Sequence, residues 1–259
     1  MLAMVLALAV IQGPVTPAAP LHYRIEAKTT SEQDLTSMGR GKLTGGLATT
    51  AFVSVTLTDS AEGQIVRVTV DSMKLEPTGQ MTTALPLAAA GPVADSARGS
   101  FVRSYAVRGA LRGAPQASNA SPALATIVQA MNVFFPGLRS AMKVGDSWAD
   151  TTNVDTPVQG NGVTGRQTGR IVATWKVTGM EDGAFVLDGT ALTTMVSNAS
   201  NGSVVKVTGR SQEHMIMPGR GPARSATIES SNDITQTTSQ QATPIPARSS
   251  GSLRLIHLP

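Results

Sequence analysis

Polar and apolar residues alternate along most of the chain after residue 20. In segment 21–30, Tyr23, Ile25 and Ala27 alternate with charged residues, and the same period of two returns over 52–58. Successive side chains of a β-strand point to opposite faces of a sheet, so this period indicates half-buried strands. The pattern recurs at 66–75, 101–111, 171–178, 184–196, 204–217, 224–236 and 252–258.

Turn residues separate most of these segments, for example at 59–63, 180–183 and 198–203. About nine or ten strands at hairpin spacing are typical of an all-β fold and not of alternating strands and helices. Within 66–75 the apolar positions change parity between Val70 and Met73, as a β-bulge requires. We therefore expect a mainly β fold with one short helix: a strongly curved antiparallel sheet, half-barrel or barrel-like.

The helix is expected near 121–135, where the period changes from two to that of a helix. Ser121 is placed to cap it, Pro122 suits its first turn, and Pro136 with Gly137 would end it. One face of this helix is apolar, and such a helix would plug or cover the open side of a curved sheet. Core packing is one interpretation of this face; contact with an apolar ligand or a docking partner is the other. The residues of this apolar stripe are Leu124, Ile127, Val128, Met131, Phe134 and Phe135.

The first twenty residues predict the compartment. Segment 2–11 is an uninterrupted apolar run of signal-peptide length and is too short for a membrane-spanning helix. Thr16 and Ala18 are small enough to precede a cleavage site, although no Lys or Arg precedes the run; a buried N-terminal helix or strand is the alternative. We expect 1–20 to be a signal peptide and 21–259 to be one antiparallel β domain without an integral membrane span.

Composition narrows the function classes. The chain has 259 residues, of which 41% are hydrophobic and 3% aromatic, and its formal net charge is +4. Its densest basic run, from Arg98 to Arg112, has only Phe101 and Tyr105 as stacking aromatics, which disfavours nucleic-acid binding. Few aromatics also disfavour an outer-membrane barrel. The Pro- and Gly-rich segments 77–99 and 217–225 are expected to be surface loops.

Catalytic, cofactor and metal motifs are sparse. The run GNGVTG at 160–165 matches a dinucleotide fingerprint, but it precedes a strand where that motif needs a helix. His22, His214 and His257 lie on separate strand-like segments without a zinc-protease or nucleophile-elbow spacing. The chain has no cysteine, which excludes disulfides, thiolate metal sites and a lipid-modified cysteine. We expect no enzyme activity, cofactor or metal.

The order helix, FFPGL (134–138), KVGDSW (143–148) and strand resembles a family of uncharacterised exported bacterial proteins. More distantly, it is similar to the LolA-like half-barrels that carry lipoproteins through the periplasm. The resemblance implies an antiparallel sheet wrapped around a helix, with a cavity between them in the carrier proteins. It also implies that Gly145 and Asp146 form the turn before a strand and that Trp148 anchors this strand in the core. Pro136 belongs to the aromatic-proline segment that precedes this turn.

Two functions follow as hypotheses. The first is a non-enzymatic, periplasmic or secreted binding protein that holds an apolar ligand or lipid between the sheet and the helix. The second is an accessory structural subunit that docks on a membrane-protein complex at the periplasmic face. A hydrolase is a distant third.

Overall fold

The structure is a computed structural model that describes residues 19–60, 63–80, 87–107, 110–119, 121–135, 142–160, 163–218, 221–238 and 241–259. Most of the expected signal peptide lies outside this part of the chain, as do Pro136 and Gly137, which were expected to end the helix.

In this part of the chain, eleven antiparallel strands form one sheet, which does not close into a barrel. Strand β1 lies in its middle and pairs with β2 on one side and with β11 on the other, while β5 and β6 are the two edges. The order is β5-β4-β3-β2-β1-β11-β10-β9-β8-β7-β6. The strands are β1 (Leu21–Asp34), β2 (Lys42–Ser60), β3 (Gly63–Gly79), β4 (Phe101–Val107), β5 (Ala110–Ala117), β6 (Ser147–Gly160), β7 (Val163–Glu181), β8 (Ala184–Ala199), β9 (Val204–Met217), β10 (Ser225–Thr238) and β11 (Gln241–Leu258).

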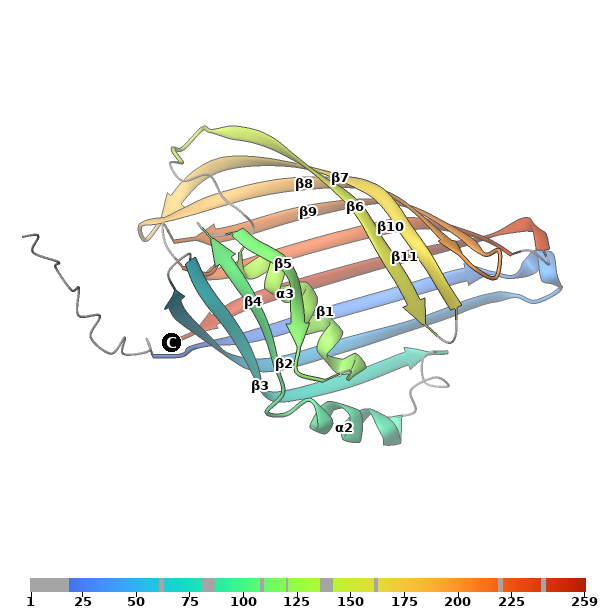
Figure 1. Cartoon of the computed structure of the whole chain (residues 1–259), viewed down its shortest axis with the longest axis horizontal. Coiled ribbons are helices and arrows are strands. Elements are labelled where there is room, and N and C mark those ends of the chain that lie inside the picture. Colours follow the sequence, from blue (N-terminus) through green and yellow to red (C-terminus); the bar gives the residue numbers. More distant parts are fainter. Residues whose placement is uncertain are drawn as a thin grey trace, which may run out of the picture.

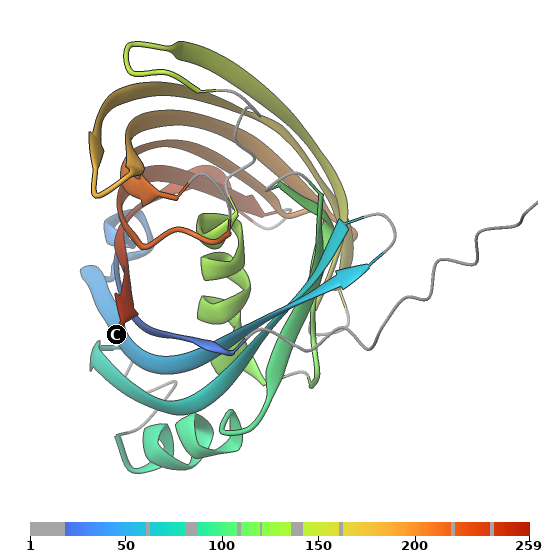
Figure 2. The same cartoon turned by 90° about the vertical axis from the view of Figure 1, so that its left-hand side faces the viewer.

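Helix α3 (Ala125–Phe134) follows the edge strand β5, and the chain then returns to the opposite edge, β6. The sheet curves strongly, and α3 lies inside the curve, as Figures 1 and 2 show. The expected fold class, a mainly β, curved antiparallel sheet around a helix, is confirmed. A second helix, α2 (Leu87–Ser96), packs against β3, and short 3₁₀ helices form at η1 (Thr36–Met38) and η2 (Pro122–Leu124).

The inner face of the sheet is apolar where it meets α3. Tyr23 and Ile25 of β1, Val53 of β2 and Leu255 of β11 are all buried and belong to one hydrophobic cluster with the helix. Register places these residues beside one another across the strands. The period of two that predicted the strands is therefore the period of burial against α3.

The bulge predicted in β3 is confirmed. Phe52 pairs with Ser72 and Val53 pairs with Val70, so Asp71 is the extra residue. With it, the residues on both sides of the bulge face inward: Val66, Val68 and Val70 before it, Leu75 after it. One additional residue compensates for the parity change in the sequence.

Three sequence expectations need correction. Segment 77–99 is not only a loop, because α2 forms in it and buries Ala90 and Ala94, and Ala97 is buried in the turn that follows. An alanine-rich run favours a helix, and Gly91 and Pro92, which suggested a loop, lie inside it. Segment 101–111 is not one strand: it ends at Val107, and β5 begins at Ala110.

The start of α3 also differs from the expectation. Ser121 does not cap the helix with its side chain; its backbone C=O accepts the N–H of Leu124 at 3.0 Å in the 3₁₀ turn η2. The Ser121 N–H instead donates to the Asn119 side chain. In the 3₁₀ turn, a backbone C=O accepts an N–H at the start of the helix, which a capping side chain would otherwise accept.

Candidate functional site

The apolar stripe of the predicted helix packs into the core. Leu124, Ile127, Met131, Phe134 and Phe135 are buried, and Val128 is partly buried against the same cluster. Phe134 meets Tyr23 of β1 edge-on, with 4.8 Å between the ring centroids. The stripe therefore fastens α3 to the sheet.

The opposite side of α3 borders open space. Gln129, which is exposed, and Val133 line a hollow of about 350 Å³ against β6, β7, β9 and β10. We call it the β7 hollow; its other lining residues are Asp150, Thr152, Ile171, Ala173, Trp175, Glu213, Met215 and Ile228. Every strand residue of this set lies on the inner face by its register.

A second hollow of about 340 Å³ adjoins it over β1, β10 and β11. Gln129, Val133 and Ile228 line both hollows, so the two share a boundary beneath the helix. We call this one the β11 hollow, and the pair together the inner trough. Ala27, Ile228 and Leu253 supply apolar walls to the β11 hollow. Hydroxyl and amide side chains form much of the rest of its lining: Thr29, Gln129, Ser230, Asn232, Ser249, Ser250 and Ser252. Each hollow falls in the size range of small-molecule sites, about 300–1,000 Å³.

The wall of the β7 hollow contains an indole ring pressed against a glycine. A Cβ on Gly189 of β8 would come within 2.6 Å of the Trp175 ring, so only glycine leaves room for it. The two residues are register partners on neighbouring strands. Trp175 is buried, which makes it a rigid part of the wall.

Two carboxyl groups line the same hollow. Glu213 of β9 is half-buried beside Met215, and its carboxylate accepts the Ser211 hydroxyl at 3.1 Å. Burial raises the pKa of Glu213, and the hydrogen bond from Ser211 opposes that rise. Asp150 of the edge strand β6 is exposed, and its carboxylate accepts the N–H of Thr151 at 2.8 Å.

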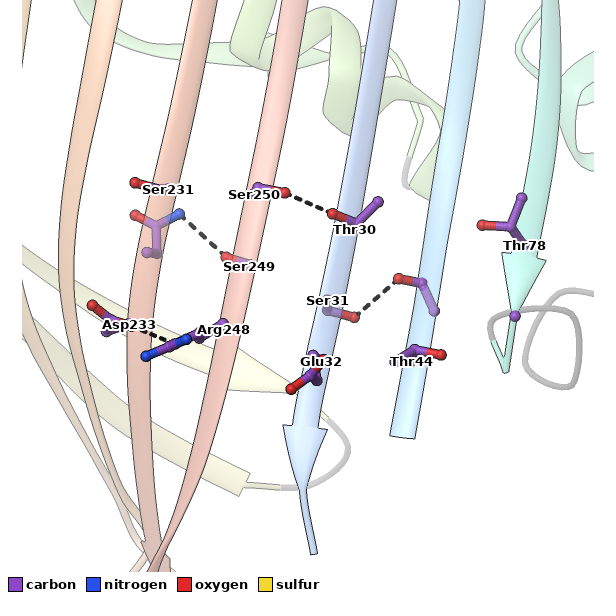
Figure 3. A pocket seen from close by; sticks show the side chains of 13 residues that line it. Thr30, Ser31, Glu32, Thr44, Thr78, Ser231, Asp233, Arg248, Ser249 and Ser250 are labelled. Atoms are coloured by element: carbon purple, nitrogen blue, oxygen red, sulfur yellow. Dashed lines mark hydrogen bonds and ion pairs between the residues drawn. The ribbon is translucent and has the colours of Figure 1, made fainter. Parts of the chain in front are cut away.

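A larger depression, of about 650 Å³, covers the far ends of β1, β2, β3, β10 and β11 (Figure 3). Its polar side chains already bond one another: Thr30 with Ser250 at 2.7 Å, and Arg248 with Asp233 at 3.2 Å. Neighbouring residues such as Ser249 and Ser250 both contribute, and they point to opposite faces of the sheet. The depression thus wraps the strand ends, and α3 does not line it, whereas Gln129 and Val133 of α3 line both hollows of the inner trough.

The three histidines lie at three separate places. His214 contacts Asp188 at 2.7 Å on the outer face, and His257 packs its ring against Tyr23. His22 contacts the Ser54 hydroxyl at 3.2 Å, and that hydroxyl donates to Asp71. In a hydrolytic triad the histidine stands between the serine and the acid, whereas here the serine stands between the other two.

The segment 143–148 forms a turn that leads into β6. Gly145 has φ of +95°, a conformation that favours glycine, and its N–H donates to Val177. The Asp146 carboxylate accepts the N–H of Lys143 at 2.9 Å. Trp148 is partly buried against the core and pairs in register with Trp175.

Sequence reasoning did not single out Gln129, Val133, Trp175 or Glu213 as site residues. Glu213 interrupts the small and apolar inner-face positions of β9, and that departure was the available signal.

Within the described residues, no group of three or more metal-ligating side chains gathers in one place. The helices in this part of the chain are also too short or too polar to cross a membrane. No protein-family model matches the chain, and no curated protein matches it.

Proposed function

We propose that this protein is a non-enzymatic, exported periplasmic protein that binds an apolar ligand or lipid in the inner trough. The observation that carries this proposal is the pair of adjoining hollows between α3 and the inner face of the sheet. Apolar walls supply affinity for a hydrocarbon chain, at about 0.8 kcal/mol for each buried CH₂ group. The resemblance of the segment 121–148 to exported bacterial proteins and lipoprotein carriers agrees with this role.

The helix has the properties that a trough wall needs. Its buried stripe holds α3 against β1, and the backbone C=O of Phe134 accepts the N–H of Ala223 from the loop before β10. Gln129 and Val133 are thereby kept at a fixed place above the sheet. A rigid wall lowers the entropy lost when a ligand binds.

The docking hypothesis has weaker support. An interaction surface for another protein is normally a contiguous apolar patch. The large apolar side chains that are exposed in the described part of the chain come from five separate segments: Met38, Phe52, Val144, Met180 and Leu192.

Blocking the trough tests the proposal. Ser230→Phe places a ring in the β11 hollow, and Ser231→Phe, the matched control, places the same ring on the outer face of β10. Protein purified from its own host would be examined by native mass spectrometry and by extraction of bound lipid. We expect a bound lipid or apolar molecule in the wild-type protein and the control, and its loss in Ser230→Phe. A wild-type protein that is always empty would contradict the proposal.

A further inference from the structure

Charge is sorted between the two faces of the sheet. In β1 to β4 and β6 to β11, as far as the structure describes them, register places every Lys and Arg on the outer face. Examples are Arg24 beside Glu26, Lys74 beside Glu76, and Arg166 beside Asp155. The whole chain carries a formal net charge of +4, but among the described residues of these strands the inner face carries carboxyl groups and no lysine or arginine.

Carboxyl groups are the charged side chains of the inner trough. Asp150 and Glu213 line the β7 hollow, and no lysine or arginine is among the described residues that line either hollow. A carboxylate has room for about four hydrogen bonds. Glu213 accepts one from Ser211, which leaves capacity for a donor from a ligand.

The hollow also contains an aromatic surface. Trp175 lines it together with the two carboxyl groups, and Gly189 fixes the position of its ring. Among aromatic side chains, an indole attracts cations most strongly, by about 0.5–2 kcal/mol depending on exposure. Two carboxyl groups and an indole that line one hollow are groups that recognise an ammonium ion.

We propose that the inner trough takes a single-chain amphiphile with a positively charged ammonium head. The head lies in the β7 hollow near Asp150, Glu213 and Trp175. The hydrocarbon chain extends past Ile228 and Val133 into the β11 hollow. This inference rests on the proposed binding function and adds the class of head group.

The opposite charge would be rejected. An anionic head in the β7 hollow would face two carboxyl groups, and the described lining residues include no cation to pair with it. Burial of Glu213 disfavours its ionised form, which costs free energy and raises its pKa. A cation beside it favours the ionised form and removes part of that cost, whereas an anion increases it.

Three probes with the same twelve-carbon chain separate the possibilities: dodecylammonium, dodecanol and dodecanoate, each below the concentration at which it aggregates. Binding to the full chain would be measured by titration calorimetry and by the fluorescence of its two tryptophans. We expect dodecylammonium to bind about tenfold more tightly than dodecanol, as one partly desolvated charge contact implies, and dodecanoate to bind most weakly.

Removing the two carboxylates should abolish this preference. In Asp150→Asn/Glu213→Gln, dodecylammonium should lose about tenfold in affinity and dodecanol should bind as before. The control Asp155→Asn/Glu229→Gln removes the same charge from the outer face and should keep the preference. Asp150→Asn alone, at an exposed position, provides a partial effect if the double variant does not fold.

The outcomes distinguish this inference from the proposed function. If all three probes bind equally, if dodecanoate binds best, or if the inner double variant keeps the cation preference, the ammonium inference is wrong and an apolar site remains. If none of the probes binds, both the inference and the proposed function are contradicted.

Discussion

The ring of Tyr23 on β1 meets the ring of Phe134 on α3 edge-on, with 4.8 Å between the centroids and 86° between the planes. Both residues are buried, and burial raises the pKa of the Tyr23 hydroxyl above its ordinary range. Edge-to-face rings attract each other through their quadrupoles by about 0.5–1.5 kcal/mol beyond the area that they bury. This contact joins the middle strand of the sheet to the helix that borders the trough.

Truncating Phe134 should therefore loosen the helix. We expect Phe134→Ala to lower the free energy of unfolding by about 3–5 kcal/mol, because it removes a fully buried ring and leaves a cavity. Urea denaturation followed by circular dichroism would measure the loss. Phe52→Ala is the control, since Phe52 is 41% exposed on the outer face, and it should cost far less. Equal losses in the two variants would mean that Phe134 does not anchor the helix.

Gly189 should not tolerate a side chain. In Gly189→Ala the new Cβ would lie 2.6 Å from the Trp175 ring, so the indole must move. We expect a loss of about 1–3 kcal/mol in the free energy of unfolding and a shift in tryptophan emission. Gly179→Ala on β7 is a suitable control because its Cβ would meet nothing within 4 Å. An unchanged emission spectrum in Gly189→Ala would refute the packing described for Trp175.

The extra residue in β3 should be needed for its register. Deleting Asp71 would send Met73 and Leu75 to the outer face, or shift the pairing of the preceding half of the strand. Each apolar side chain that moves from the core to water costs about 1.5–3 kcal/mol. Asp71→Ala keeps the residue count and should retain the fold. Similar melting temperatures for the deletion and the substitution would show that the bulge does not set the register.

Glu213 should make stability depend on pH. Its pKa is raised in the folded protein by burial, while in the unfolded chain it takes its ordinary value of 4.5. The folded state therefore binds more protons between these two values, and the free energy of unfolding falls as pH rises through the raised pKa. The contribution of Glu213 to the free energy of unfolding is fully present below pH 4.5, and it is lost progressively as the pH rises from 4.5 through the raised pKa.

Glu213→Gln cannot ionise and should escape this loss. We expect the stability of the variant relative to wild type to improve as pH rises from 4 to 8, measured by urea denaturation at several pH values. Glu229→Gln corrects for the removal of one charge, because Glu229 is exposed on the outer face of β10. A difference that stays constant with pH would contradict the burial of Glu213.

Local patterns in the sequence determined the strands, the bulge and the helical stripe. Tyr23, Ile25 and Val53 occupy alternating positions because their strands have one dry face, and that constraint acts on each short segment separately. The same argument placed Leu124 to Phe135 on one side of a helix. It missed α2, where Gly91 and Pro92 suggested a loop but buried alanines pack the helix on β3. The polar strand β6 was also not delimited, because many of its residues are exposed on both faces.

The tertiary structure alone decided which residues share the trough. Asp150, Trp175 and Glu213 come from β6, β7 and β9, and they line one hollow because three successive hairpins bring these strands into one sheet with the three side chains on its inner face. Pairing of β1 with β11 likewise joins the two ends of the described chain. Strand pairing is set by the packing of the whole sheet and not by the neighbouring residues in the sequence. For this reason the sequence predicted a sheet around a helix, while the acidic wall of the inner trough emerged only from the folded chain.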